Sequence, residues 1–175
     1  MSGEDLRVRN ATLSDLPEIV RMLADDPLGA RREQVSEPLP NSYVQAFEAI
    51  ERDPNNELVV AEDPGHAVVG VLQITFTPHI VHRGGWRATI EGVRVERGHR
   101  HAGVGRGLMD WAIERARDRR CRLVQLTTDK LRRDARRFYE GMGFSPTHEG
   151  MKLRLSPGTA ATGRRPQAPR RREAG

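Results

Sequence analysis

Hydrophobic and polar positions repeat with two different periods along this chain, and the periods separate predicted strands from predicted helices. Alternation with a period of two in β-branched stretches predicts strands, whereas apolar positions three and four residues apart predict helices. The strand pattern occurs at 6–9, 57–62, 67–77, 86–95, 122–127 and 151–155. The helix pattern occurs from Thr12 or Ser14 to about 24, and then at 43–52, 103–119 and 131–142.

Prolines and glycines interrupt this pattern and mark the connections between elements. The longest interruption, 25–41, holds three prolines and a glycine, and it predicts a loop between the first two helices. Residues 63–66 are typical of a hairpin turn, and residues 78–85 connect the third predicted strand to the fourth. The resulting order of strands and helices favours an α/β (α+β) fold, and we expect residues 1–155 to form one domain.

The stretch from Val93 to Arg106 joins a strand end, a turn, a glycine-rich loop and the start of an amphipathic helix. Within it, Arg100, Gly103 and Gly105 give the pattern Arg-x-x-Gly-x-Gly. Glycines let backbone N–H groups approach phosphate oxygens, and a helix N-terminus adds a partial positive charge. This order of parts predicts a pocket for a pyrophosphate. The structural alternative is an ordinary glycine-rich turn in an arginine-rich protein.

A second motif follows the next predicted strand. The pattern is Ala-x-x-Phe-Tyr-x-x-x-Gly-Phe, and its positions are Ala135, Phe138, Tyr139, Gly143 and Phe144. In this order, the two motifs resemble those of the GNAT superfamily of N-acetyltransferases, over about residues 6–155. The resemblance implies a central mixed, mostly antiparallel sheet of six to seven strands with about four helices, splayed between the fourth and fifth strands. It also implies acetyl-CoA as the co-substrate and no metal.

The resemblance assigns coenzyme binding to two stretches and one further residue. GNAT proteins have a break in the fourth strand that exposes backbone groups to the acyl-carrying arm, and Gly92 is suited to such a break. The residues implied are Val93, Arg94, Val95, Arg100, His101, Ala102, Gly103, Val104, Gly105 and Arg106. Many relatives carry an asparagine that contacts the coenzyme seven residues before the tyrosine. Arg132 stands there instead, where it could bind a phosphate or leave that contact absent.

Glu91 is the candidate general base. An alkyl ammonium of pKa about 10.4 is neutral only about once in 2,500 molecules at pH 7, so the acceptor amine must lose a proton. Many GNAT enzymes have a glutamate at this place, which acts directly or through a water. Period two places Glu91, Val93 and Val95 on one face of the strand. The structural alternative is a strand carboxylate paired with Arg94 or Arg87.

Tyr139 is the candidate acid for the departing thiolate, by the same resemblance, with a core tyrosine as the structural alternative. The backbone N–H of Val95 or a neighbour would polarise the thioester carbonyl. The mechanism implied is direct attack in a ternary complex, in which Cys121 needs no role.

The acceptor is expected to be a primary amine of a small molecule, with the 25–41 loop and the 78–85 turn framing its site. These segments and the residues just after them supply charged and aromatic side chains, namely Arg31, Arg32, Glu33, Glu37, Tyr43, His79, His82 and Trp86. Two alternatives stay open: acetylation of a peptide or protein amine, and a non-catalytic coenzyme-binding regulatory module whose arginine-rich tail contacts nucleic acid. No metal site is predicted, since His79 and His82 have no third ligand nearby.

Composition limits the remaining possibilities. Cys121 is the single cysteine, no apolar run approaches the roughly 20 residues that span a bilayer, and the N-terminus lacks a signal-peptide core. A soluble cytoplasmic protein is therefore expected. Of the net charge of +5, residues 156–175 carry five arginines and one glutamate, or +4. This tail is predicted to be disordered, and nucleic-acid binding is not favoured because no aromatic residues interleave with its arginines. A homodimer is one of the oligomeric states left open, since GNAT relatives are often dimers.

Overall fold

The computed structural model describes residues 6–153 and 155. Its contacts divide the chain into a first unit that ends at Phe144 and a second that begins at Ser145. The first unit contains a five-stranded sheet in the order β1, β2, β3, β4, β5. These strands span Arg7–Asn10, Asn56–Glu62, Val68–Pro78, Trp86–Val95 and Cys121–Leu126. Strands β1 to β4 run antiparallel and β5 runs parallel to β4, which confirms the predicted mixed, mostly antiparallel sheet.

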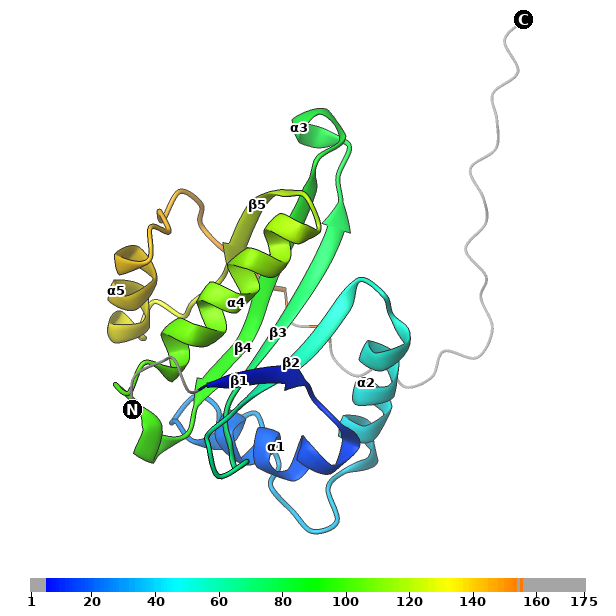
Figure 1. Cartoon of the computed structure of the whole chain (residues 1–175), viewed down its shortest axis with the longest axis vertical. Coiled ribbons are helices and arrows are strands. Elements are labelled where there is room, and N and C mark those ends of the chain that lie inside the picture. The colour runs from blue at the N-terminus through cyan, green and yellow to red at the C-terminus, as the bar shows by residue number, and fades with distance from the viewer. Residues whose placement is uncertain (1–5, 154, 156–175) are drawn as a thin grey trace, which may run out of the picture. The chain divides into compact units, whose positions relative to one another are not determined.

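Four helices of at least nine residues accompany this sheet within the described part of the chain, as predicted. They are α1 (Leu16–Ala24), α2 (Asn41–Arg52), α4 (Val104–Asp118) and α5 (Arg133–Gly141). Three short elements complete the set: η2 (Leu13–Asp15), α3 (Val81–Gly84) and η3 (Arg97–His99). Figure 1 shows α4 lying across the sheet and α3 at the tip of the β3–β4 hairpin. The same view shows α1 near the opposite end of that hairpin.

The core has two layers because the central strands are buried on both faces. Leu108 and Met109 of α4 pack with Val59 on one face, whereas Ile19 of α1 packs with Val60 on the other. Neighbouring residues of a strand point to opposite faces, so an uninterrupted apolar run in β2 serves both layers. Burial of this kind favours the fold by about 25 cal/mol for each Å² of apolar surface removed from water.

The pairing of β4 with β5 ends half-way along β4. The register runs from Trp86 opposite Cys121 to Ile90 opposite Leu126, where β5 stops. Strand β4 continues to Val95 beside β3 alone, and its pairing with β3 is irregular between Val71 and Gln73. Gly92 lies in this stretch with a φ of 63°, a left-handed conformation that favours glycine. The predicted separation of the fourth and fifth strands is therefore present.

The predicted last strand is wrong for the residues that the structure describes. Met151, Leu153 and Leu155 alternate as strand residues do, yet each is more than 80% exposed. None of the described residues after Phe144 belongs to a strand. Alternation alone is insufficient, because a strand needs a neighbour that satisfies its backbone and covers its apolar side chains. The described sheet thus has five strands rather than six or seven. The predicted tail at 156–175 lies outside the described residues.

Candidate functional site

The end of β4 presents two backbone carbonyls on its unpaired side. The Glu96 N–H donates to Val69 O of β3 at 2.9 Å, so the backbone of the preceding residue, Val95, faces away from β3. Val93 O accepts a hydrogen bond from Arg94 Nη1 at 2.7 Å, and Val95 O accepts one from Arg100 Nε at 3.2 Å. Arginine side chains thus satisfy both carbonyls. Because side chains can move aside more readily than a strand can, these groups suit a ligand that brings its own amide donors.

Glu91 lies on the face of β4 opposite to Val93 and Val95, which corrects the predicted placement of all three on one face. Ile90 and Val93 both pack with the α4 layer, although they are three positions apart. In a regular strand, residues an odd number of positions apart point to opposite faces, so the alternation is interrupted between them, at Gly92. Glu91 lies opposite Gln73 of β3, and its side chain is exposed. A bulge adds one residue to a strand and reverses the faces of all residues that follow.

The alternative pairing of Glu91 with an arginine is not observed. Arg87 donates from Nη1 to Gln125 Oε1 at 3.1 Å, and the carboxylate beside Arg94 is that of Asp26, at 3.6 Å. The face of Glu91 continues along β4 and β5 as a polar row, because Gln125 Nε2 also donates to Thr89 Oγ1 at 3.1 Å. An exposed carboxylate beside hydrogen-bonding side chains is accessible to a polar acceptor and to water.

The glycine-rich loop leads directly into the N-terminus of α4. Gly103 precedes the helix with a φ of 87° and has no side chain to cap it, so the first backbone N–H groups of α4 are open to a ligand. Val104 is buried, whereas a Cβ added at the neighbouring Gly105 would meet other residues only at ordinary contact distances. The other residues predicted here are His101, with a φ of 65°, the half-buried Ala102, and Arg106, which pairs with Asp110 at 3.7 Å.

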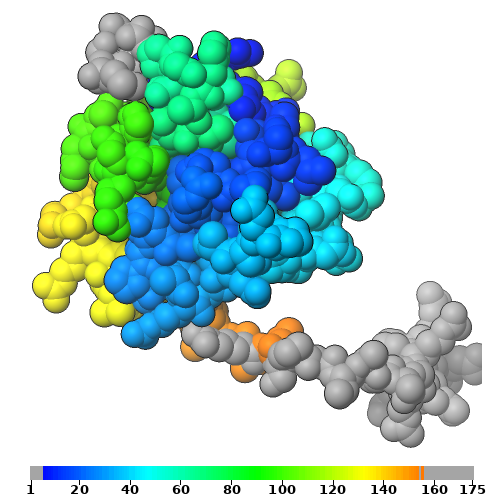
Figure 2. All heavy atoms as spheres, turned by 90° about the horizontal axis from the view of Figure 1, so that it is seen from below, coloured from blue at the N-terminus to red at the C-terminus, as the bar shows by residue number. Residues whose placement is uncertain are grey.

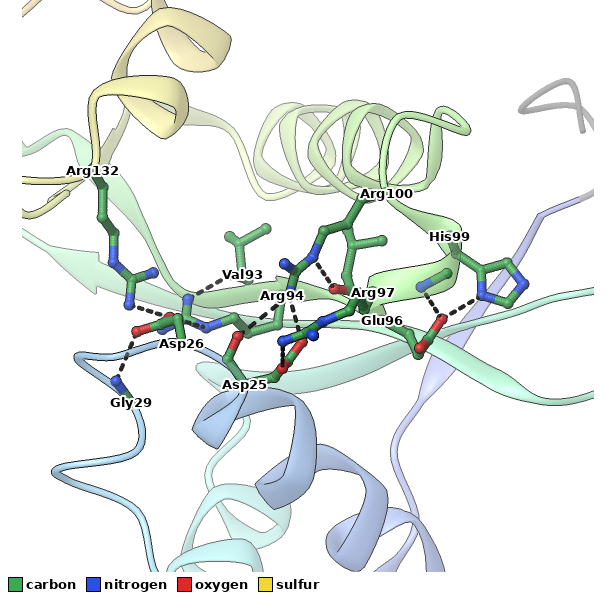
Figure 3. A network of polar contacts seen from close by, with 12 residues as sticks. Asp25, Asp26, Gly29, Val93, Arg94, Glu96, Arg97, His99, Arg100 and Arg132 are labelled. Atoms are coloured by element: carbon green, nitrogen blue, oxygen red, sulfur yellow. Dashed lines mark hydrogen bonds and ion pairs between the residues drawn. The ribbon is translucent and has the colours of Figure 1, made fainter.

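Two consecutive aspartates after α1 bind the arginines of this region. Asp25 Oδ1 accepts from Arg97 Nη2 at 2.8 Å, and Asp25 Oδ2 accepts from Arg100 Nη2 at 2.6 Å. Asp26 Oδ2 accepts from Arg132 Nη2 at 2.6 Å. Figure 3 shows both carboxylates between the α1 end, the β4 end and the start of α5. The segment after α1 is therefore fixed against the predicted coenzyme loop.

Tyr139 lies on α5, and its ring packs edge-on against two phenylalanines. The ring centroids of Phe138 and Phe144 are 5.3 and 6.1 Å from that of Tyr139. Burial raises the pKa of the Tyr139 hydroxyl, although the positive charges of Arg94 and Arg132 act in the opposite direction. The hydroxyl thus stays protonated at neutral pH, as a proton donor must. Both the predicted role and the core alternative fit this packing.

Of the two segments predicted to frame the acceptor, only 25–41 lies near these groups. In Figure 2 the light-blue segment after α1, the green turn after β4 and the yellow α5 adjoin one another. The 78–85 turn instead lies at the start of β4, whose ten residues separate it from Val95 by about 30 Å at the usual strand rise. His79, His82 and Trp86 line a separate cavity of about 350 Å³ there. The prediction that this turn frames the acceptor is therefore wrong, because β4 runs away from the turn and carries Val95 at its opposite end.

Other chemistries find little support in the described residues. Burial raises the pKa of the Cys121 thiol, and Cys121 lies opposite Trp86 at the far end of β4. Among residues 6–153 and 155, no three histidine, cysteine, aspartate or glutamate side chains gather as metal ligands would. In the same residues, no helix is long and apolar enough to cross a membrane.

Asp25 and Asp26 are the site residues that sequence reasoning missed. They are separated from their arginine partners by 68 to 106 positions along the chain, so no local pattern connects them. The available signal was weak: two adjacent acids at the end of a predicted helix, where acidic residues oppose the helix dipole. Such a placement indicates that their charge is compensated elsewhere.

Comparisons with known proteins agree on one family. The model of the acetyltransferase (GNAT) family matches residues 17–144. The chain is 33% identical over 107 residues to the aminoalkylphosphonate N-acetyltransferase of Salmonella typhimurium, an overlap of 61% of this chain and 68% of that protein. Among solved structures, a transcriptional regulator from Bacillus halodurans is 55% identical with a TM-score of 0.83, covering 86% of this chain and 99% of that one. A Trypanosoma brucei acetyltransferase is 25% identical with a TM-score of 0.69, covering 86% and 100%.

Proposed function

Because the chain belongs to the GNAT acetyltransferase family, we propose that it transfers the acetyl group of acetyl-CoA to the primary amine of a small molecule. The observation that carries this proposal is the convergence of three parts at the end of β4. These are the carbonyls of Val93 and Val95, which now accept from arginine side chains and not from a neighbouring strand, the uncapped N-terminus of α4, and the protonated Tyr139 hydroxyl. Acyl transfer needs a donor cradle and a proton source close together, and these parts supply both.

The residues present fit acetyl-CoA. The pyrophosphate would lie against the backbone N–H groups that follow Gly103, with Arg100 and Arg106 nearby as countercharges. The amide groups of the acyl-carrying arm would replace the arginine side chains that now contact Val93 O and Val95 O. Acetyl-CoA supplies the activated acetyl group, and the remaining requirements fall on the chain itself.

The catalytic roles follow from position. Glu91 would take the proton of the acceptor ammonium, and its exposure favours transfer through a water. As the amine nitrogen bonds to the acetyl carbon, the nitrogen releases its second proton to solvent and the bond from that carbon to sulfur breaks. Tyr139 would give its proton to the departing sulfur and recover one from solvent. The N–H of Val95, which lies on the unpaired side of β4, would donate to the carbonyl oxygen as negative charge develops on it.

Two conservative variants test these roles. Glu91→Gln and Tyr139→Phe should each lower kcat by about 10² to 10⁴, the usual contribution of one general acid or base. Calorimetric titration should show unchanged acetyl-CoA affinity for Glu91→Gln, because that side chain lies on the face of β4 away from Val93. Glu114→Gln, on the exposed side of α4, is the matched control and should keep full turnover. Wild-type turnover in both test variants would contradict the mechanism.

The acceptor screen has a rational starting point. The Salmonella relative is named for aminoalkylphosphonates, so short amines with and without a phosphonate form the first panel. Acetylation of a small amine would support the proposal, whereas transfer only to peptide or protein amines would favour the alternative acceptor class.

A second candidate function is a regulatory protein that binds the coenzyme without turnover. The observation that favours it is the description of the Bacillus halodurans relative as a transcriptional regulator. Deletion of residues 156–175, which hold five arginines, provides the test. Salt-dependent retention of DNA that disappears on this deletion, together with absent turnover, would support the regulatory function.

A further inference from the structure

Arg94 is a guanidinium held in an incompletely satisfied environment. Its side chain is only 15% exposed, and its Nε is buried without a hydrogen-bond partner. The nearest carboxylate oxygen, Asp26 Oδ2, lies 3.6 Å from Nε, which is within range of an ion pair but too far for a good hydrogen bond. A buried N–H donor without an acceptor raises the free energy of the folded protein, so an additional anionic oxygen that accepts from Arg94 Nε would be stabilising.

Asp26 has little capacity left to satisfy Arg94. Its Oδ1 accepts from the backbone N–H groups of Leu28 and Gly29 at 2.9 and 2.7 Å, and its Oδ2 accepts from Arg132 at 2.6 Å. Figure 3 shows Arg94 and Arg132 on either side of this single carboxylate. The adjacent Asp25 is already bonded to Arg97 and Arg100.

The cluster carries excess positive charge. Arg32 and Arg132 both act on Arg94 by charge repulsion, and Asp26 is the carboxylate that opposes them. Three guanidiniums and one carboxylate leave a net charge of +2. A planar guanidinium bonds carboxylate and phosphate-type oxygens through paired N–H groups, so this cluster suits an anion of that shape.

Arg94 also lies on the same face of β4 as the candidate base. Val93 packs with the α4 layer, so the next residue points to the opposite face, which is the face of Glu91. The two residues are three positions apart, a span of at most about 10 Å along a strand. A short molecule could therefore place an amine near the carboxylate and an anionic group near the arginines.

We propose that Arg94 and Arg132 bind an anionic group of the acceptor, so that the preferred substrates are short primary amines carrying a phosphonate, phosphate or carboxylate. This inference rests on the proposed acetyl transfer to a small amine, and it adds the class of acceptor and the residues that select it. The arginines act by binding and positioning the acceptor, while proton transfer stays with Glu91 and Tyr139.

Three acceptors of similar length test the class: 3-aminopropylphosphonate, 4-aminobutyrate and butylamine. Wild-type protein should acetylate at least one of the anionic amines with a kcat/KM ten to a hundred times that of butylamine, the range expected for charge-assisted hydrogen bonds. Comparing the phosphonate with the carboxylate identifies which anion fits. Equal kcat/KM for all three would overturn the proposed subsite while leaving acetyl transfer intact.

Arginine variants test the residues. Arg132→Gln should lose most of the preference for the anionic amine over butylamine, and the loss should come through the KM of the anionic amine. Arg94→Lys keeps the positive charge but not the paired N–H donors of the guanidinium, so it should lose part of the preference for the anionic amine. This variant also avoids an uncharged group at a buried position. Arg136→Gln is the matched control, because Arg136 lies exposed on the same helix and pairs with Glu140. An Arg132→Gln variant that instead weakens acetyl-CoA binding would assign this residue to the coenzyme and overturn the proposal.

A binding measurement separates failure of this inference from failure of the enzymatic function. Propylphosphonate is titrated into protein saturated with CoA, so no turnover is required. We expect its Kd to rise by about ten- to a hundredfold in Arg132→Gln and to stay unchanged in Arg136→Gln. If no amine is acetylated, the proposed function fails, and arginine-dependent binding of propylphosphonate still supports the anion site. Absence of such binding overturns it.

Discussion

Substitution of Gly105 by alanine tests whether a glycine is required at this position by the ligand or by the fold. Gly105 is the second residue of α4, and a methyl group there would meet Val95 Cγ2 at 3.5 Å and Phe138 Cζ at 3.8 Å. Both are ordinary contact distances, so the protein itself accommodates alanine. Alanine in place of a helical glycine stabilises by up to about 1 kcal/mol, which raises the Tm of a domain of this size by about 2–4 °C.

The same methyl group should obstruct the donor. A phosphate oxygen that is hydrogen-bonded to a backbone N–H lies about 2.9 Å from the nitrogen. A Cβ added at Gly105 would restrict the space through which the phosphate reaches the N–H groups at the start of α4. We expect acetyl-CoA affinity to fall at least tenfold, or about 1.4 kcal/mol. Calorimetric titration gives the affinity and thermal unfolding gives the stability, so one variant reports two changes of opposite sign.

Two further glycines provide the comparisons. Gly141 ends α5, and a Cβ there meets nothing within 4 Å, so Gly141→Ala should leave acetyl-CoA binding unchanged. Gly103 has a φ of 87°, so Gly103→Ala should cost about 1–2 kcal/mol of stability as well as affinity. Wild-type affinity in a stable Gly105→Ala protein would refute the assignment of this loop to the pyrophosphate. A drop in its Tm would refute the packing argument.

Three other variants test the strand break, the acid and a buried ion pair. Gly92→Ala, at a φ of 63°, should lose about 1–2 kcal/mol in denaturant unfolding and most of its turnover, because the bulge sets the faces of β4. The raised pKa of Tyr139 predicts that kcat/KM shows no alkaline loss from this group until the pH exceeds 10, and an earlier loss that disappears in Tyr139→Phe would contradict its placement. The hydrogen bond from Arg9 lowers the pKa of Asp15, so Asp15 contributes stability above pH 3.8 that disappears as the pH falls through the lowered value. Unfolding curves at pH 3 and 7 should therefore differ less for Asp15→Asn, which should cost about 1–3 kcal/mol at pH 7.

The sequence predicts the elements of this fold well because each carries its own periodicity. The four long helices and the first five strands are found within a few residues of their expected positions. The prediction of a sixth strand is wrong because Met151 and Leu153 alternate as strand residues do, yet their side chains are exposed and no described strand pairs with them. Periodicity indicates which secondary structure a segment favours, whereas strand formation also requires a neighbouring strand, which the segment's own sequence does not specify.

The faces of β4 could not be predicted by counting. Alternation places Glu91 with Val93, but the added residue at Gly92 places Glu91 with Arg94 instead. The glycine was visible in the sequence, and so was the expectation of a break. What the sequence did not reveal is whether the break inserts a residue, which depends on the register of β3 opposite it.

The same correction changes what Arg132 indicates. Judged by its motif position, this residue replaces an amide that contacts the coenzyme in many relatives, which implied a phosphate contact. In the structure its guanidinium bonds Asp26, on the side of β4 where Arg94 also points. Asp26 itself follows Asp25, which holds Arg97 and Arg100 of the coenzyme loop. The two adjacent carboxylates thus connect the donor region to the arginines that we assign to the acceptor. Loss of the Asp26 charge should therefore change the KM of the acceptor more than it changes the affinity for acetyl-CoA. Measuring both quantities in Asp26→Asn decides whether the two regions are as separate as this geometry indicates.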